Sequence, residues 1–333
     1  MSLLDRERIK LLSLQRIVAP DLERFEAELA GLMAGGTPLA DRICGHIQRG
    51  RSKRFRPTLL LLAAKGDGPV DDRAVAAAAC VELIHTATLV HDDFIDGAVT
   101  RRGLPSVNRE WGGAAALIMG DYLYAKALDA LCQRGLDDAV RQLAGTTFLM
   151  SEAEMLQLES KYSMDVDEPL YLRIISCKTA VLIEAACEIG ASFNPGVNGH
   201  RASFGRFGRK VGLVFQITDD IFDYLGDARR LGKPTGQDWE EGRVTLPLIA
   251  ALRQAPPAAS AALRAAAGEA GTGWKELWPQ VKAFVAEHEG VDYARALARR
   301  YGEEAKAELA PVAGGPQREL LAAAAEYVIH RLS

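Results

Sequence analysis

Cysteine is scarce in this chain, with 5 residues in 333. The five are widely spaced, and no two form a C-x-x-C pair: Cys44, Cys80, Cys132, Cys177 and Cys187. An odd number of cysteines without such a pair argues against a disulfide framework and against a structural zinc site. We therefore predict free thiols and a reducing, cytoplasmic environment.

An excess of charge of one sign is also missing. The 40 basic side chains face 44 acidic ones, which leaves a formal net charge of -4. Such a chain has no global basic field to attract nucleic acid or an anionic membrane surface. We expect no nucleic-acid partner, and any site for an anionic ligand must be local.

Long hydrophobic runs are few. The first ten residues carry five charges, unlike a secretory signal peptide. The longest apolar-rich stretch runs from Ala74 to Val90 and contains Glu82 and His85. That stretch is short and polar for a membrane span. We predict a soluble protein without a transmembrane segment.

Strand patterns are absent as well. No run of alternating Val, Ile and Thr lies between turn signals, whereas helical periodicity dominates and the segments are rich in Ala and Leu. We expect helices at roughly residues 71–96, 114–134, 137–162, 169–190 and 200–224. No flexible linker or shift in composition divides the chain, although its length would fit about two domains. The sequence predicts one all-α domain over residues 1–333.

The clearest motif is a pair of D-D-x-x-D clusters. Their members are Asp92, Asp93 and Asp96, and then Asp219, Asp220 and Asp223. On a helix, residues four apart lie on one face, so each cluster presents two carboxylates side by side. The repulsion between them is offset when a divalent cation binds, and oxygen-only ligands favour a hard ion such as Mg²⁺.

One such cluster alone is more often a solvated helix end than a site. Here each cluster ends an apolar stretch, at residues 89–91 and 214–217, which places the carboxylates beside buried surface. We therefore expect the two clusters to form facing walls of one cavity that binds Mg²⁺.

Basic side chains stand in short groups near both clusters. They are Lys53, Arg54, Arg56, Arg101, Arg102, Lys178, Lys233 and Arg243. Each alone is more often a surface charge. Beside two magnesium-type clusters, however, they form a set suited to phosphate, with Arg as a bidentate fork and Lys as a point charge. This set implies that more than one diphosphate group is bound.

Several motifs of other chemistries are missing. The chain has no G-x-x-x-x-G-K-[ST] loop and no G-x-G-x-x-G turn after a strand, which argues against a nucleotide ligand. No serine elbow or Cys/His pairing indicates acyl transfer. Diphosphate bound through metal in an apolar, helical cavity points to a hydrocarbon diphosphate.

Three segments, in this order, resemble motifs of the all-trans polyprenyl diphosphate synthases: residues 82–103, 215–223 and 232–247. The resemblance extends from about Arg51 to Ala250. It implies one large helical bundle around a deep central cavity, and usually a homodimer. It also implies a Mg²⁺-dependent prenyltransferase that condenses isopentenyl diphosphate head-to-tail with an allylic diphosphate.

The resemblance further implies roles for individual residues. Mg²⁺ is held by Asp92, Asp96 and Asp219, with Asp93, Asp220 and Asp223 in support. The allylic diphosphate is bound by Arg101, Lys178, Thr179, Gln216, Lys233 and Arg243. The catalytic residues that the resemblance implies are Asp92, Asp96, Arg101, Lys178, Thr179, Gln216, Asp219 and Lys233, and of these Thr179 and Gln216 lie beside the developing cation. Isopentenyl diphosphate is bound by Lys53, Arg56, His85 and Arg102. Without the resemblance, His85 would be read equally well as a core histidine.

Three positions depart from the family pattern. Arg51-Ser52 replaces the usual pair of glycines before the first basic group, which changes the backbone freedom of that turn. Arg243 stands where a lysine is usual, so charge is kept and geometry changes. Phe94 is bulkier than the usual aliphatic residue.

Product length in this family depends on the depth of the hydrophobic pocket below the first cluster. The positions four and five residues before Asp92 are Thr88 and Ala87, which are small. A large aromatic residue there would stop growth early, as in synthases that make farnesyl diphosphate. We therefore predict a product of geranylgeranyl length or longer, with farnesyl diphosphate as the alternative. Residues on the next helix that could floor the pocket, Leu123, Ala127 and Leu128, are not ranked by the sequence.

Two other functions compete with this interpretation. A terpene cyclase shares the helical cavity but binds no second diphosphate, so Lys53, Arg56 and Arg102 argue against it. A non-catalytic partner subunit would be expected to lose the aspartates, and all six are present.

Overall fold

The structure is a computed structural model that describes residues 11–50, 52–66, 68–197, 199–225, 235–270, 273–312 and 316–330. Its helices from the N-terminus through the first aspartate cluster are α2 (Ala19–Met33), α3 (Pro38–Arg49), α4 (Phe55–Ala64) and α5 (Asp72–Ile95). The middle of the chain holds α6 (Val107–Trp111), α7 (Gly113–Gln133), α8 (Asp137–Glu159), α9 (Glu168–Ile175), the π-helical segment η1 (Ser176–Ala180), α10 (Val181–Ser192), the 3₁₀ turn η2 (Pro195–Val197) and α11 (Arg201–Leu225). The remainder holds α13 (Gln237–Glu240), α14 (Leu246–Gln254), α15 (Pro257–Ala270), η3 (Trp274–Leu277), α16 (Trp278–Glu287), α17 (Gly290–Glu308) and α18 (Pro316–His330).

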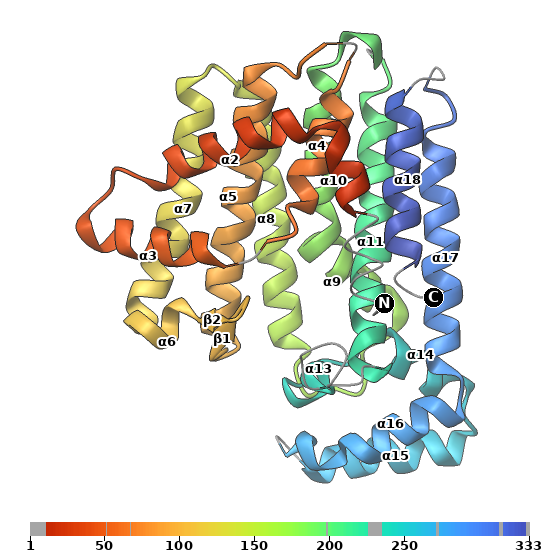
Figure 1. Ribbon diagram of the computed structural model, residues 1–333. Coiled ribbons are helices and arrows are strands. Elements are labelled where there is room, and N and C mark those ends of the chain that lie inside the picture. The colour runs from red at the N-terminus through yellow and green to blue at the C-terminus, as the bar shows by residue number, and fades with distance from the viewer. Residues whose placement is uncertain are drawn as a thin grey trace.

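Long helices run side by side through most of the molecule. Figure 1 shows α5, α8, α10, α11, α17 and α18 in this arrangement, with α15 and α16 lying across one end. The apolar faces of these helices form one continuous core, which includes nearly all of α4 and α10. The expected all-α fold class is confirmed.

Helix α5 passes through the centre of this core. It begins after Asp71, whose side chain accepts a hydrogen bond from the backbone N–H of Arg73 at 2.7 Å, and it ends at Asp96. Its 24 residues agree with the helix expected over residues 71–96, and by length and composition alone α5 could cross a membrane. However, 78% of its apolar window is buried inside the molecule, as in the core helix of a soluble protein.

Helices α10 and α11 approach each other closely because glycine faces the contact. A Cβ atom on Gly212 would lie 2.5 Å from Cα of Ala180, a distance that real Cβ atoms do not reach. The absence of a side chain therefore lets α11 lie directly against η1. This contact brings Gln216, which precedes the second aspartate cluster on α11, within hydrogen-bond distance of Thr179 on η1.

The expected helix over residues 169–190 is not continuous. Residues Ser176–Ala180 form a π-helical turn between α9 and α10. Such a turn inserts an extra residue, so it rotates the side chains that follow it, and it is frequent at functional sites. The periodicity of the sequence does not show the insertion, because both flanking helices are apolar.

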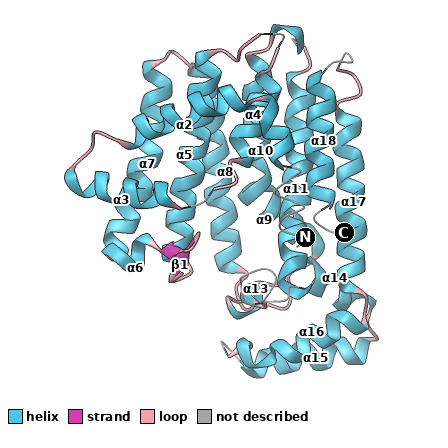
Figure 2. Ribbon diagram, viewed as in Figure 1, coloured by secondary structure: helices cyan, strands magenta, loops and turns pink. Residues whose placement is uncertain are grey.

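Two smaller predictions also need correction. The helix expected to reach residue 162 ends at Glu159. The expectation of no strands fails for a short antiparallel ladder, in which Thr100–Arg101 (β1) pairs with Leu104–Pro105 (β2), drawn in magenta in Figure 2. Its turn residues Arg102 and Gly103 have φ angles of 54° and 83°, as a two-residue type I′ hairpin requires. Two residues per strand are too few for a sequence pattern.

The cysteines agree with their prediction. All five are free thiols; Cys44, Cys80 and Cys187 are buried, whereas Cys132 is exposed. Burial raises the pKa of the Cys44 thiol to about 11 and that of Cys80 to about 12. These two thiols therefore stay protonated and unreactive at neutral pH.

Candidate active site

The first aspartate cluster lies at the C-terminal end of α5. Burial raises the pKa of Asp92 to about 6; Lys178 opposes this increase, and the carboxylates of Glu154 and Asp96 add to it. Lys178 is 2.6 Å from Glu154, measured from Nζ to Oε1. Three carboxylates and one lysine thus meet in a partly buried space, and the excess negative charge there favours a bound cation.

Asp93 has different surroundings. It is 3% exposed and accepts a hydrogen bond from Nε of Arg101 at 2.8 Å, with Nη2 of the same guanidinium also in contact. Burial raises the pKa of Asp93, and Arg101 opposes the increase. This pair fixes the β1–β2 hairpin, and with it Arg102, against α5.

The second cluster lies near the end of α11, where Asp220 is 3% exposed. Its carboxylate accepts hydrogen bonds from the Tyr171 hydroxyl at 2.7 Å and from Nε2 of Gln216 at 2.8 Å. Burial raises the pKa of Asp220 to about 8, and the nearby Asp238 carboxylate raises it further, whereas the two donors lower it. Gln216 in turn accepts a hydrogen bond from the Thr179 hydroxyl at 2.8 Å. One hydrogen-bonded chain therefore links η1 to α11.

Asp223 holds the segment that follows the second cluster. Its carboxylate accepts hydrogen bonds from the backbone N–H groups of Gly236, Gln237 and Asp238, at 3.0, 3.1 and 3.1 Å. Burial raises its pKa to about 6, the Asp238 carboxylate adds to this increase, and the three N–H groups oppose it. Asp223 thus fixes the start of α13. Asp219, on the neighbouring turn of α11, is half-buried.

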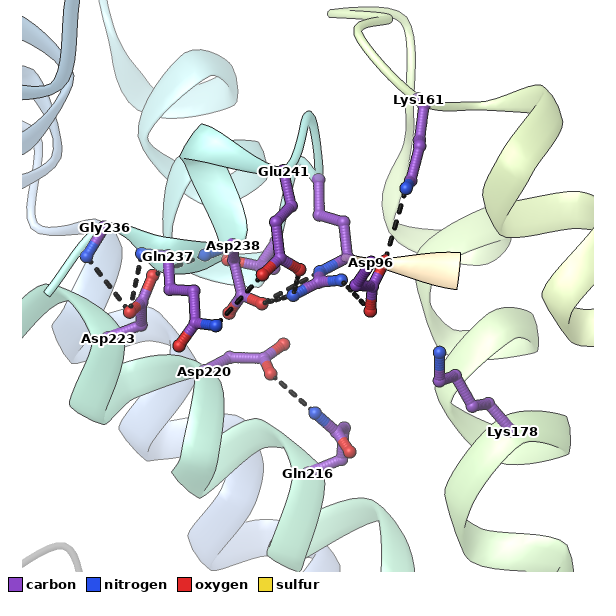
Figure 3. Close-up of polar contacts among 12 residues, drawn as sticks. Asp96, Lys161, Lys178, Gln216, Asp220, Asp223, Gly236, Gln237, Asp238 and Glu241 are labelled. Atoms are coloured by element: carbon purple, nitrogen blue, oxygen red, sulfur yellow. Dashed lines mark hydrogen bonds and ion pairs between the residues drawn. The ribbon is translucent and has the colours of Figure 1, made fainter. Parts of the chain in front are cut away.

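Arg243 links the first cluster to the segment that follows the second cluster. Its Nη1 is 3.3 Å from Oδ2 of Asp96, its Nη2 is 2.9 Å from Oδ1 of Asp238, and it also pairs with Glu241. Although burial lowers the pKa of Arg243, these carboxylates raise it well above its usual value. Figure 3 shows Asp96 and Lys178 on one side of the site and Asp220 and Gln216 on the other.

A second group of cations lies around His85, in the middle of α5. Nη1 of Arg56 is 3.0 Å from Nε2 of His85, and Nε of Arg56 is buried without a hydrogen-bond partner. Burial lowers the pKa of Arg56 to about 10, and burial together with Arg56 and Arg102 lowers the pKa of His85 well below its usual value. His85 is therefore neutral, and the site has unused donors and excess positive charge, which suit an anion.

The remaining cations of the N-terminal group differ from one another. Lys53 is exposed. Arg54 has a left-handed backbone, with φ of 49°, and pairs with Glu82 at 2.9 Å and with Glu26 at 2.8 Å, so its charge is already neutralised. Ser52, at one of the positions that depart from the family pattern, donates a hydrogen bond to Glu82 at 3.1 Å. Arg51 lies outside the described residues.

Four predicted positions remain, of which the structure describes three. Ala87 is 3% exposed and Thr88 is half-buried, both on α5 within two turns of Asp92. Phe94 is 41% exposed, and its ring packs on Gly113 at the start of α7, where a Cβ atom would lie 2.3 Å from the ring. Lys233 lies outside the described residues, and so do its neighbours Gly232 and Pro234.

The donors at the two clusters fit a hydrated divalent ion. Among the residues that the structure describes, no three His, Cys, Asp or Glu side chains gather closely enough to hold an ion by themselves. The carboxylates of the two clusters offer only oxygen, and burial, with smaller contributions from the Glu154 and Asp96 carboxylates, raises the pKa of Asp92, so a cation there would be favourable. This arrangement suits an ion that keeps several waters and is completed by phosphate oxygens.

Comparison with known proteins agrees with this geometry. Residues 37–281 match the family described as polyprenyl synthetase. This chain belongs to the polyprenyl synthetase family. It is 32% identical to an octaprenyl diphosphate synthase of Haemophilus influenzae over 292 residues, which cover 88% of each protein. It is 39% identical over 245 residues to a heptaprenyl diphosphate synthase component 2 of Geobacillus stearothermophilus, covering 73% of this chain and 76% of that protein.

This member of the polyprenyl synthetase family is similar to a solved structure over nearly the whole length of both chains. That structure is a polyprenyl synthase from Caulobacter crescentus, described as complexed with calcium and isoprenyl diphosphate. The two share 31% identity with a TM-score of 0.89, over 97% of this chain and 98% of the other. The predicted fold and the predicted reaction class, prenyl transfer, are thereby confirmed.

Sequence reasoning missed several residues of this polyprenyl synthetase site. They are Glu154, Lys161, Tyr171, Asp238 and Glu241. Tyr171 is 49 positions from its partner Asp220, and Glu154 lies in a helix with no acidic motif. Asp238 and Glu241 could have been found from the sequence, because both lie within five residues of Arg243 and an arginine is expected to pair with nearby acidic side chains.

Proposed function

We propose that this chain extends an allylic diphosphate with isopentenyl diphosphate to an all-trans polyprenyl diphosphate of geranylgeranyl length or longer. One observation carries the proposal: two charged regions of different chemistry lie along α5, one acidic and one basic. Acidic side chains at its end face α11, and the buried Arg56–His85 pair lies about two turns earlier. Two substrates, each with a diphosphate, require two such regions side by side.

We propose that Mg²⁺ binds to Asp92, Asp96 and Asp219. The division of roles is supported by the contacts of the other three aspartates. Asp93 accepts a hydrogen bond from Arg101, and Asp220 accepts one from Tyr171. Asp223 accepts hydrogen bonds from the start of α13. We therefore assign these three aspartates to orienting the residues around the metal site. When bound, Mg²⁺ supplies Lewis acidity and neutralises charge on the allylic diphosphate.

The basic residues complete the allylic site in this proposal. Arg101, Lys178, Lys233 and Arg243 contact the diphosphate, and the first two share the partly buried space around Asp92 and Asp93. Thr179 and Gln216 lie beside the carbon that becomes cationic, where oriented dipoles stabilise charge. The Gln216 amide is held at both ends, by Thr179 and by Asp220, so its orientation is fixed before substrate binds.

The second substrate, isopentenyl diphosphate, is assigned to Lys53, Arg56, His85 and Arg102. The orphaned Nε of Arg56 supports this assignment, because it offers a donor to an anion beside the neutral His85. The allylic C–O bond breaks first, and its electrons leave with the diphosphate. The double bond of isopentenyl diphosphate, held nearby, then forms the new C–C bond. The released diphosphate takes the proton lost from the product, so no side-chain base is required.

Small residues on α5 support a long product. Ala87 and Thr88 are small side chains on the helix that carries Asp92, and relatives are named octaprenyl and heptaprenyl diphosphate synthases. We expect Ala87→Phe to shorten the main product by at least one isoprene unit, because the ring fills the path of the growing chain. Thr88→Ser is the matched control. An unchanged product length in Ala87→Phe would place the floor of the pocket elsewhere.

We further propose that residues 1–333 form one domain, and that the protein is a cytoplasmic homodimer. Large apolar side chains are exposed on α7 and α8 and would be covered by a second copy: Leu117, Ile118, Phe148 and Met155.

The proposal is tested by product analysis. Purified protein is incubated with Mg²⁺, labelled isopentenyl diphosphate and, separately, dimethylallyl, geranyl, farnesyl or geranylgeranyl diphosphate, and the dephosphorylated products are resolved by length. We expect products of geranylgeranyl length or longer, with Asp92→Asn lowering turnover at least 10²-fold. Products that stop at farnesyl would keep the reaction and refute the length. No incorporation by folded protein with any primer would favour a cyclase or a silent subunit.

A further inference from the structure

Lys161 lies between α8 and α9, in no recognised motif. Its Nζ is 3.3 Å from Oδ1 of Asp96, while Nη1 of Arg243 is 3.3 Å from Oδ2 of the same carboxylate (Figure 3). The side chains of Lys161, Arg243 and Asp96 are only 21%, 19% and 17% exposed. A single, largely buried carboxylate therefore holds two cations, one on each oxygen.

The two cations differ in their other partners. Arg243 also pairs with Asp238 and Glu241. For Lys161, Asp96 is the one ion-pair partner within the part of the chain that the structure describes. If Asp96 turns to another cation, Arg243 keeps two carboxylates, whereas Lys161 is left without a counter-charge.

The segments that carry the two cations are joined. The backbone N–H of Tyr162 donates to the carbonyl of Gly242 at 2.8 Å. Gly242 has a φ angle of 79°, and a Cβ atom there would lie 2.9 Å from the Tyr162 ring. This close contact places Lys161 and Arg243 on one packed unit, so the backbone of Lys161 is fixed within side-chain reach of Asp96.

We propose that Lys161 is a positioning residue that competes with divalent metal for Asp96 until diphosphate arrives, and so couples the binding of metal to the binding of diphosphate. The inference rests on the proposed function, which makes Asp96 a metal ligand. Without diphosphate, the ammonium repels a dication that approaches Asp96. With diphosphate present, Lys161 gains phosphate oxygens as partners in place of Asp96. Metal and diphosphate then strengthen each other's binding, by the same factor in both directions.

Mn²⁺ binding to the full chain tests the proposal without turnover. Free Mn²⁺ is measured by electron paramagnetic resonance with and without inorganic diphosphate, corrected for the Mn²⁺–diphosphate complex. We expect Lys161→Met to bind Mn²⁺ roughly threefold to tenfold more tightly than wild type when diphosphate is absent. Inorganic diphosphate should then increase the Mn²⁺ affinity of wild type more than that of Lys161→Met.

Two variants serve as controls. Lys161→Arg keeps the charge and should restore wild-type behaviour. Lys282→Met, on the exposed surface of α16, removes one charge elsewhere and should leave Mn²⁺ affinity unchanged. Thermal denaturation checks that each variant is folded, and Lys161→Gln replaces Lys161→Met if the latter unfolds.

Equal or weaker Mn²⁺ binding in the uncharged variant would overturn the inference. So would equal enhancement by diphosphate in wild type and variant. If wild type incorporates isopentenyl diphosphate and Asp96→Asn loses Mn²⁺ binding, such results reject only the role of Lys161. If wild type binds no Mn²⁺ and incorporates no isopentenyl diphosphate, the proposed function fails together with this inference.

Discussion

At the scale of single residues, the six aspartates of the two clusters do not share one environment. Asp93, Asp220 and Asp223 each accept hydrogen bonds from neighbouring groups of the protein. Asp92 instead faces other carboxylates, and Asp96 faces two cations that a metal would have to replace. Identical residue types therefore divide into those that shape the walls and those suited to meet a ligand.

Removing the hydroxyl of Tyr171 tests whether Asp220 orients Gln216 in the site. Tyr171→Phe removes a donor from the buried Asp220 carboxylate and should destabilise the fold by about 1–3 kcal/mol. Because Asp220 also fixes Gln216, turnover should fall by roughly tenfold. Tyr293→Phe, which removes a half-buried hydroxyl that donates to Glu168, is the control for loss of a hydroxyl. Thermal denaturation and steady-state kinetics measure both effects, and an unchanged turnover would show that Asp220 does not orient Gln216.

The neutral state of His85 gives a test that depends on pH. Its pKa in the folded protein is below its usual value because of burial and nearby arginines. Since the unfolded chain then binds a proton that the folded protein does not, the stability contributed by neutral His85 is present above about pH 6.5 and is lost as the pH falls. His85→Gln has no such dependence. We expect the difference in Tm between wild type and His85→Gln to shift against wild type from pH 7.5 to pH 5; a constant difference would mean that His85 is protonated in the fold.

At the scale of elements, the site depends on how closely α11 lies to η1. The glycine at position 212 permits this contact, and the π-helical turn carries Thr179, whose hydroxyl reaches Gln216 on α11, and Lys178, which pairs with Glu154 on α8. The result is the Thr179–Gln216 hydrogen bond, which ties the two elements at the site itself.

A pair of glycine substitutions tests this packing. Gly212→Ala places a methyl group 2.5 Å from Ala180 and should cost about 1–3 kcal/mol of stability. Gly145→Ala, on the exposed side of α8 with no atom within 4 Å of the new Cβ, should instead stabilise the protein by up to about 1 kcal/mol. Chemical denaturation compares the two. Similar values for both variants would show that the α11–η1 contact can relax.

At the scale of the whole molecule, helices α7 and α8 carry large apolar side chains that a monomer would expose to water. Leu117 and Ile118 of α7 are 48% and 67% exposed, and Phe148 of α8 is 63% exposed. Large apolar side chains gathered on neighbouring helices are a feature of interfaces. This distribution agrees with the homodimer that we propose.

Light scattering tests the assembly. Wild type should have twice the mass of one chain at micromolar concentration, whereas Ile118→Asp should shift it toward the monomer, because burying an unpaired charge at an interface is unfavourable. Leu39→Asp changes an apolar residue of α3 that is 41% exposed and serves as the control. A monomeric wild type would refute the homodimer, and the exposed apolar side chains of α7 and α8 would then need a different partner to cover them.

The sequence by itself determined the fold class, the reaction class and the positions of the charged motifs. The fold class follows from helical periodicity and the absence of strand patterns, and the carboxylates spaced four apart mark the two clusters. The reaction class follows from the resemblance of three motifs to those of the all-trans polyprenyl diphosphate synthases. The tertiary structure decided which charges meet. That Arg54 is neutralised by Glu82 and Glu26, that Tyr171 supports Asp220, and that Lys161 shares Asp96 with Arg243 all depend on contacts between segments far apart in the chain. The π-helical turn could not be predicted from the sequence for a related reason: it packs against the distant helix α11, and the apolar period of the flanking helices does not reveal it.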